Sequence, residues 1–542
     1  SLSGNPSVTY NGTIYTSSTQ VVENLTTING CDSVRVTNIT VNAPTTWTGA
    51  VNTDWNNPGN WSAGIPDTTD DIIISGGSNN PVVNQIGAAC KNLTILSGGS
   101  VTISDASYSL NADTLTIENG GQFTISNGNV YTNNFIHSGD LNISGGNLDI
   151  DGNYTASGNI NANISGGTIK VEGNWTSSGS GFDPTGGLVE FSGSVAQTIS
   201  LASGNNFYDL KINNSHASNK VSAQGSALVV SNYLNIADGI FESASDYHDV
   251  TIASGATLEL TGDITVSGNW TNTGTFTPGN HTVTFDGSSD QDLTFNASSF
   301  FHNLTISNTG SSDVDVANDL DINGNLVISS NADFDISAAS NLEIALDFTN
   351  SGTFTTDNET ITFDGASSDS ESCPAINDAD VNIVVNKTDA SGTVTFANCT
   401  VNQFTVTDGI ASIGANTVTA DDAITVSSGA ELTISSGTFN ADGASDIDGT
   451  LSITSTGKYD ADADFDATGA NVTFSGAGFI EMSGSVTKLG SSFTEGSGTV
   501  EYDGSGAQNI FNTTYNNLII DQNSTKTASA NLDVDGDLTI DN

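Results

Sequence analysis

A block of roughly forty residues recurs along this chain, and it constrains the fold more than any other feature. The block begins as GNWTSSGSGFDPTGG at Gly173 and returns as GNWTNTGTFTPGNHT at Gly268. Related copies start at Asp347 and Ser491. Spacing inside the block is kept while the gaps between blocks vary, which is typical of a stacked repeat array in which each unit touches mainly its neighbours. We therefore expect an elongated repeat protein rather than a globular enzyme.

Short apolar/polar alternating segments fill the chain after Cys90, separated by turns rich in Gly, Asn and Ser. Examples are LTILSGGSVTIS from Leu93 and ITVSSGAELTISSG from Ile424. Alternation places Leu, Ile, Val and Phe on one face of each strand and Thr, Asn, Asp and Ser on the other. The pattern predicts a parallel β-solenoid, or β-helix. At roughly 20 residues a turn, residues 100–542 predict about 22 turns and a rod of about 100 Å. A string of β-sandwiches is the alternative, and the uneven gaps between blocks fit it less well.

The chain divides into three predicted parts, all of them β-structure. Residues 1–43 alternate apolar and polar residues between turn signals, which predicts a small antiparallel module similar to a β-sandwich. Residues 44–90 are richer in Pro and Trp and form a predicted junction that caps the entry to the solenoid. Residues 91–542 are the predicted solenoid repeats. The sequence starts at Ser1 rather than Met, and its last residues, NLDVDGDLTIDN, stop within the repeating pattern without the polar cap that solenoid ends need, so we expect a segment of a longer or processed chain.

The charge balance excludes some partners. Lys and Arg together number 9 against 61 Asp and Glu, a formal net charge of -52. Binding to nucleic acid needs a basic surface that releases counterions, so nucleic acid is excluded as a partner. No apolar stretch has the length of a membrane span, so we expect no membrane insertion. Self-repulsion among so many carboxylates calls for bound Ca²⁺ or a salty environment.

Two acidic segments are candidate Ca²⁺ sites. The first is YDADADFDATG, where alternation predicts one strand face carrying Asp460, Asp462, Asp464 and Asp466. The second is DLDINGN, which resembles the opening of a Ca²⁺-binding loop and would use Asp319, Asp321 and Asn323. Carboxylate and amide oxygens are the ligands that Ca²⁺ prefers. The alternative for the first segment is a solvated strand face with screened charge.

Cysteine and tryptophan supply the remaining candidates. Cys373 and Cys399 are separated by about one predicted turn, so they could form a disulfide between adjacent turns. Aromatic rings can stack on sugars or cap an apolar core, and both interpretations apply to the cluster Trp47, Trp55 and Trp61. The five histidines are scattered and show no catalytic spacing. We therefore expect a protein that is not an enzyme.

Three segments carry a family resemblance. They are NGTIYTSS…NGCDSVRVTNITVN from Asn11, TWTGAVNTDWNNPGNW…AACKNLTI from Thr46, and the GNWTNTGTF blocks. Together they resemble extracellular β-solenoid repeat proteins and adhesins of Bacteroidota, which carry a GCDS-type Ig-like module and are exported by the type IX secretion route. The resemblance implies a secreted or cell-surface protein with a structural or adhesive role.

The expected function is therefore a subunit or segment of an extracellular fibre or filament, with copies associating end to end. A carbohydrate-binding or polysaccharide-cleaving β-helix is the main alternative, with surface polysaccharides as partners. Ice binding through flat threonine faces is a third.

Overall fold

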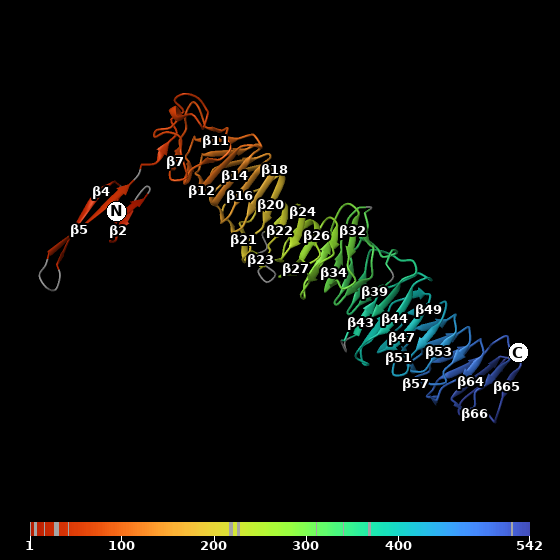
Figure 1. The fold of residues 1–542 in the computed structure, drawn as a ribbon. Helices are drawn as coiled ribbons and strands as arrows, with labels where there is room; N and C mark the ends of the chain where they lie inside the picture. Colours follow the sequence, from red (N-terminus) through yellow and green to blue (C-terminus); the bar gives the residue numbers. More distant parts are fainter. Residues whose placement is uncertain are drawn as a thin grey trace. The chain divides into compact units, whose positions relative to one another are not determined.

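The computed structural model describes residues 2–4, 8–15, 17–26, 32–41, 43–215, 220–224, 228–310, 312–339, 341–366, 370–521 and 524–541. The chain forms two compact units, Ser1–Thr261 and Gly262–Asn542. The described residues contain no α-helix, and one 3-10 turn, η1 (Pro58–Asn60), is the sole helical element among them. The prediction of an all-β parallel solenoid of about 22 turns is confirmed (Figure 1).

A small β-module opens the first unit. β5 (Asp32–Val41) lies between β1 (Leu2–Gly4), which is parallel to it, and β4 (Thr19–Thr26), which is antiparallel. β2 (Val8–Tyr10) and β3 (Thr13–Tyr15) form an antiparallel hairpin. Val8, Tyr10 and Ile39 form the buried core of this module. Such a small core is consistent with a short β-domain that gains only modest stability from burial.

The solenoid of the first unit begins in the predicted junction, because β6 (Thr45–Thr46) already pairs in parallel with β7 (Asp71–Ile74). Its strands form three parallel ladders, in which β12, β14 and β18 bend at corners and serve two ladders each. The first ladder contains β7, β10 (Asn92–Ile95), β12 (Ser109–Ile117), β14 (Asn129–His137), β17 (Tyr154–Ala156), β19 (Trp175–Ser177), β21 (Gln197–Leu201), β23 (Lys220–Gln224), β25 (Ile240–Ser243) and β27 (Thr257–Leu260). The second contains β8 (Val82–Val83), β11 (Ser100–Ile103), β13 (Gln122–Ile125), β15 (Asp140–Ile143) and β18 (Asn161–Val171). The third runs through β9 (Ala88–Ala89), β16 (Asn147–Ile150), β20 (Gly186–Phe191), β22 (Phe207–Asn213), β24 (Val229–Asp238) and β26 (Asp246–Ile252).

Side chains from successive turns stack in the core of this unit. Tyr154 pairs in register with Trp175, and their rings stack with centroids 3.6 Å apart and planes inclined by 8°. Phe135 continues the column one turn earlier, with its ring 5.5 Å from that of Tyr154. Trp175 and its counterpart Trp270 in the second unit are both buried. Parallel in-register pairing forces like side chains into one column, so these aromatics serve core packing.

The second unit is a three-faced parallel coil in which strands three apart in chain order usually belong to the same face. Its first turns form two ladders. One contains β28 (Ile264–Val266), β31 (Thr282–Phe285), β34 (Asn303–Ile306), β37 (Leu326–Ile328) and β40 (Phe348–Asn350). The other contains β29 (Trp270–Asn272), β32 (Gln291–Phe295), β35 (Val314–Val316), β38 (Asp333–Asp335) and β41 (Thr353–Thr355). The ten-stranded face contains β33 (Phe300–Phe301), β36 (Leu320–Ile322), β39 (Asn341–Ile344), β42 (Thr360–Phe363), β44 (Asn382–Asn386), β47 (Phe404–Asp408), β50 (Ile424–Val426), β53 (Ser445–Ile447), β56 (Phe465–Asp466) and β59 (Val486–Lys488).

Two further faces complete the turns of this unit. The seven-stranded face contains β43 (Ser370–Cys373), β45 (Thr393–Phe396), β48 (Ile410–Ile413), β51 (Glu431–Ile434), β54 (Thr450–Ile453), β57 (Asn471–Phe474) and β60 (Ser492–Thr494). The eight-stranded face contains β46 (Cys399–Val401), β49 (Thr417–Ala420), β52 (Thr438–Ala441), β55 (Lys458–Ala461), β58 (Phe479–Met482), β61 (Thr499–Tyr502), β64 (Asn517–Asp521) and β67 (Leu538–Asp541). Most strands show a strict buried/half-buried alternation, as the sequence pattern predicts.

A buried glutamine ties a loop to the preceding turn in three of the four sequence blocks. Gln291 Nε2 donates to the carbonyl oxygens of Val266 and Gly268, while its Oε1 accepts from Gly287 N at 2.8 Å. Gln197 and Gln508 make the same three contacts in their own blocks. We call these three residues the glutamine clamps. Each one satisfies backbone groups that would otherwise be buried without partners.

Candidate metal centre

Carboxylates stack on the outer side of one ladder in the second unit. Asp292 on β32 pairs in register with Asp315 on β35, and Asp315 pairs with Asp335 on β38. Their neighbours Leu293, Val314 and Phe334 are buried, so alternation sends the three acidic side chains outward. Adjacent strands lie about 4.8 Å apart, and the stack therefore places like charges at close range.

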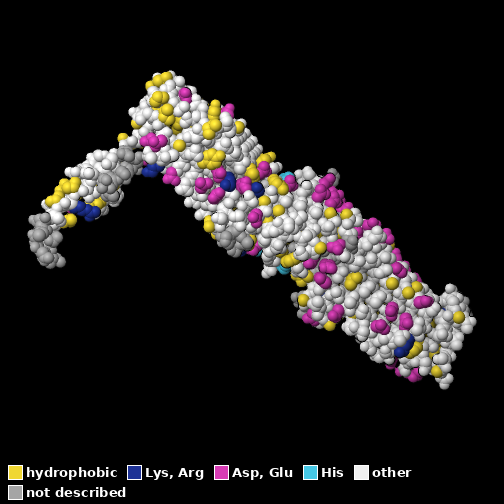
Figure 2. All heavy atoms as spheres, in the orientation of Figure 1, with side chains coloured by type: hydrophobic (Ala, Val, Ile, Leu, Met, Phe, Trp, Pro, Cys, Tyr) yellow, Lys and Arg dark blue, Asp and Glu magenta, His cyan; other side chains and the backbone are white. Residues whose placement is uncertain are grey.

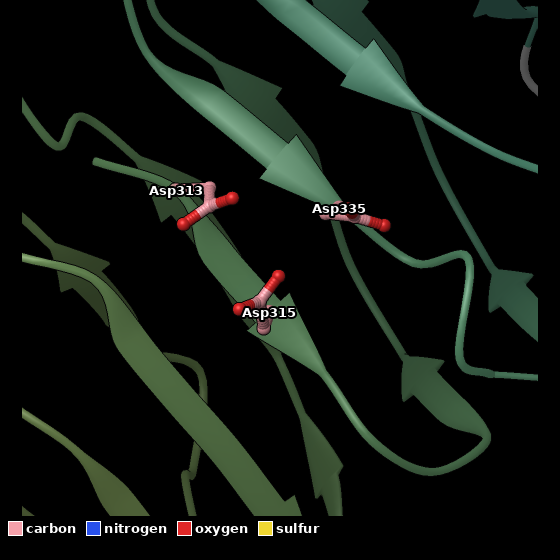
Figure 3. Close-up of side chains that lie close together, drawn as sticks. All are labelled: Asp313, Asp315 and Asp335. Atoms are coloured by element: carbon pink, nitrogen blue, oxygen red, sulfur yellow. The ribbon is translucent and has the colours of Figure 1, made fainter. Parts of the chain in front are cut away.

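The tightest group consists of Asp313, Asp315 and Asp335. One ligand oxygen from each lies within 4.8 Å of the others, and all three residues are half-buried. Figure 3 shows Asp313 and Asp315 on one strand segment and Asp335 on the neighbouring strand. Burial raises the pKa of Asp315, and the charges of Asp313, Asp335, Asp292 and Asp290 raise it further. The group is therefore electrostatically strained when all its members are ionised.

The surroundings of this group suit a hard cation that prefers oxygen ligands. A pocket of about 440 Å³ is lined by Asp292, Asp315 and Asp335 together with Thr294 and Ser337. Asp333 lies beside the group; burial raises its pKa, as do the charges of Asp313 and Asp335. Its Oδ1 atom is buried and has no hydrogen-bond partner among the described residues. Ca²⁺ binds six to eight oxygens at about 2.3–2.6 Å, so three oxygens within 4.8 Å can surround one ion.

The prediction of four aspartates on one strand face is wrong. Asp460 lies on β55 of the eight-stranded face, whereas Asp466 lies on β56 of the ten-stranded face. The chain turns a corner between them, at Asp462 and Asp464. Asp460 instead pairs in register with Glu481, and Lys458 bridges both, at 2.8 and 2.6 Å.

The second predicted set, Asp319, Asp321 and Asn323, lies around β36. Asp321 is paired in register with Glu343 of the next turn. Burial raises the pKa of Asp321 to about 6, and the charges of Asp364 and Glu343 add to the effect. Asp319 Oδ1 accepts a hydrogen bond from Asn341 N at 3.1 Å. The carboxylates that face Asp321 thus come from later turns rather than from its own loop.

The three N-terminal tryptophans pack into one another. The rings of Trp47 and Trp55 each meet the ring of Trp61 edge to face at 4.8 Å, and all three side chains are buried. Trp47 Nε1 donates to Asn79 O, and Trp61 Nε1 donates to Trp55 O, both at 2.7 Å. Buried rings offer no free face for stacking on a sugar, so this cluster acts as a core cap.

The three described cysteines, Cys90, Cys373 and Cys399, are free and buried. The structure therefore has no disulfide between Cys373 and Cys399. Cys31 lies outside the described residues. Burial raises the pKa of the Cys399 thiol to about 12 and raises that of Cys373 well above its usual value. Because the thiolate is the reactive form, all three described cysteines are chemically quiet at neutral pH.

Comparison with known proteins gives one match. A family model described as "Domain of unknown function (DUF8693)" matches residues 46–182. No curated protein and no solved structure matches the chain. Among the described residues, no helix has the length and apolar character needed to cross a membrane. The matched segment runs from the tryptophan cap through the early turns of the first solenoid, up to Phe182 beside Trp175.

Proposed function

We propose that this chain is a non-enzymatic, extracellular structural or adhesive protein that forms a segment or subunit of a cell-surface fibre. The observation that carries the proposal is the in-register parallel stacking of turn upon turn within each unit. Every strand in such a coil is fixed by hydrogen bonds to the turns before and after it, which makes a stiff scaffold. Stiffness and repetition suit a load-bearing or surface-presenting role.

The outer faces support an adhesive role through repetition. Figure 2 shows Asp and Glu side chains distributed over the visible surface, with few Lys or Arg among them. Weak contacts that recur on many turns add up through multivalency, because each bound turn raises the effective concentration of the next. A multivalent partner or a second copy of the chain is the expected binder. Strands at the end of a parallel ladder can pair with another copy, which extends the coil head to tail.

The extracellular location rests on the resemblance to type IX-exported Bacteroidota proteins and on the net charge of -52. Divalent cations would reduce the repulsion within the acidic surface, and we expect Ca²⁺ at Asp313, Asp315 and Asp335.

Two measurements test the proposal. Light scattering after size-exclusion chromatography, over a range of concentrations, should show end-to-end association, and negative-stain images should show chains joined along their axes. Antibody labelling of intact cells should reveal the protein at the surface. A monomer at every concentration combined with a purely internal location would refute the proposal.

A further inference from the structure

A lysine and a glutamate face each other inside the coil of the second unit. Ile383, Val385 and Lys387 alternate with exposed or half-buried residues along and just after β44, so all three point inward. Glu371 points inward from β43 in the same way, two residues before buried Cys373. The exposed fractions of the Lys387 and Glu371 side chains are 0% and 2%.

The ammonium group of Lys387 and the carboxyl group of Glu371 are in direct contact. Lys387 Nζ donates to both carboxylate oxygens of Glu371 and, at 3.2 Å, to the carbonyl oxygen of Ala345. A nitrogen that reaches both oxygens of a carboxylate lies opposite the carboxyl carbon between them. Gly365 leaves the space that the amine needs, since a Cβ at that position would lie 2.7 Å from Lys387 Nζ. The nitrogen is therefore held in contact with the carboxyl group, and attack on the carboxyl carbon needs only a shift of the two side chains that brings the amine over the face of the carboxyl plane.

The same position is neutral in the related blocks. Phe363 pairs with Val385 as Phe191 pairs with Ile212 and Phe285 with Ile306, which aligns three turns. Two residues further along, buried Asn214 and Asn308 occupy the place of Lys387. The clamp Gln197 occupies the place of Glu371, and its Oε1 accepts from Asn214 Nδ2 at 3.0 Å. At this corner of the first unit, two uncharged amide side chains therefore hydrogen-bond to each other where the second unit has a charged pair.

The charged version has a cost that the neutral version avoids. Two ions taken out of water lose their hydration, and a buried ion pair often recovers less than it loses. Burial raises the pKa of Glu371, although Lys387 opposes that shift. Condensation of an amine with a carboxyl group requires the neutral form of the pair, with the proton on the carboxyl group, and removal from water favours neutral groups over charged ones.

We propose that Lys387 Nζ and Glu371 Cδ form an intramolecular isopeptide bond. The amine nitrogen attacks the carboxyl carbon, the C–N bond forms, and the carboxyl C–OH bond breaks. The nitrogen gives up one proton, which leaves with the hydroxyl group as one molecule of water. The product is a neutral secondary amide that joins the segment after β44 to β43, and no oxidant or other reactant is needed. The bond would join strands of two different faces covalently, whatever the protein's biological role.

The direct test is the intact mass of the purified chain, measured in denaturant after reduction of the cysteines. The expected mass is lower than the sequence mass by one water molecule. Digestion at acidic residues should then yield a branched peptide joining Lys387 to Glu371, identified by fragmentation. An unmodified mass overturns the proposal. A water loss that maps to Asp364 or to any other residue overturns the assignment as well.

Two controls sharpen the test. The double variant Lys387→Met, Glu371→Leu replaces the pair by apolar groups of similar size and should show the full sequence mass and a native circular dichroism spectrum. Lys220 is an internal control, because it lies 2.5 Å from Glu242 and 2.6 Å from Glu259 but is exposed to solvent. A branched peptide at Lys220 would contradict the dependence on burial.

Discussion

Replacing Trp175 by alanine tests whether the core of the first unit is a stacked column. The indole is fully buried, stacks on Tyr154, and meets Phe182 and Phe207 edge to face at 4.9 and 5.3 Å. Truncating a buried aromatic residue to alanine costs about 3–5 kcal/mol, and the loss of the parallel stack is included in that range. We expect a loss near the upper end, because the neighbouring backbone is held by ladders on both sides and cannot collapse into the cavity.

Hydrogen exchange with mass spectrometry locates the loss. In a coil whose turns touch mainly their neighbours, protection should fall in β17, β19 and β21 and remain unchanged in distant turns such as β51 and β54. Thr176→Ala is the matched control, since Thr176 lies on the same strand but is exposed, and it should change stability by less than about 0.5 kcal/mol. Equal loss of protection over both units, or a cost below about 1 kcal/mol for Trp175→Ala, would refute the reasoning.

Four further predictions follow from single groups. Burial lowers the pKa of His137 to about 4, so the free energy of unfolding of the first unit should fall by up to about 3 kcal/mol as pH falls from about 6.5 to 4. Urea unfolding should show that the stabilities of wild type and His137→Gln become similar at low pH. The pKa of Asp321 is raised to about 6, so its effect on the pH dependence of stability has the opposite sign. The free energy of unfolding of the second unit should fall as pH rises from about 4 to 6, and Asp321→Asn should flatten that dependence in melting experiments at several pH values. Asp315→Asn should raise the melting temperature without Ca²⁺ and abolish any rise produced by Ca²⁺; equal Ca²⁺ effects in variant and wild type would exclude the site. Gln291→Ala should cost about 2–3 kcal/mol in chemical denaturation, because three buried backbone groups lose their partner, and a cost near zero would show that water replaces the clamp.

Local alternation carried the fold prediction because it reports directly which side chains face inward. The blocks at Trp175 and Trp270 fall on equivalent turns, and both rings are buried as a packing role requires. The same alternation gave a wrong prediction for Asp460–Asp466, which it placed on one strand face. The two-residue period continues without a break although the chain turns a corner of the coil there. A two-residue repeat cannot report that the chain has passed from one face to the next.

The candidate cation group could not be predicted because its members come from different turns. Asp313 and Asp315 meet Asp335 only through the register of β35 and β38. That register depends on turn lengths, which vary along the chain. The Lys387–Glu371 pair was accessible in principle, because aligning the blocks places both charges at positions that hold amides elsewhere.

The corner that holds a glutamine clamp in three blocks tolerates a longer loop in the fourth block, where Glu371 takes the place of the glutamine. The segment from Gly365 to Glu371 is longer than the one from Gly287 to Gln291, yet the strands on either side keep the same pairing. A foreign peptide placed between Ser289 and Asp290 should therefore be displayed outward without shifting the turns that follow. Evolution or engineering can decorate such a coil at these points while its interior stays untouched.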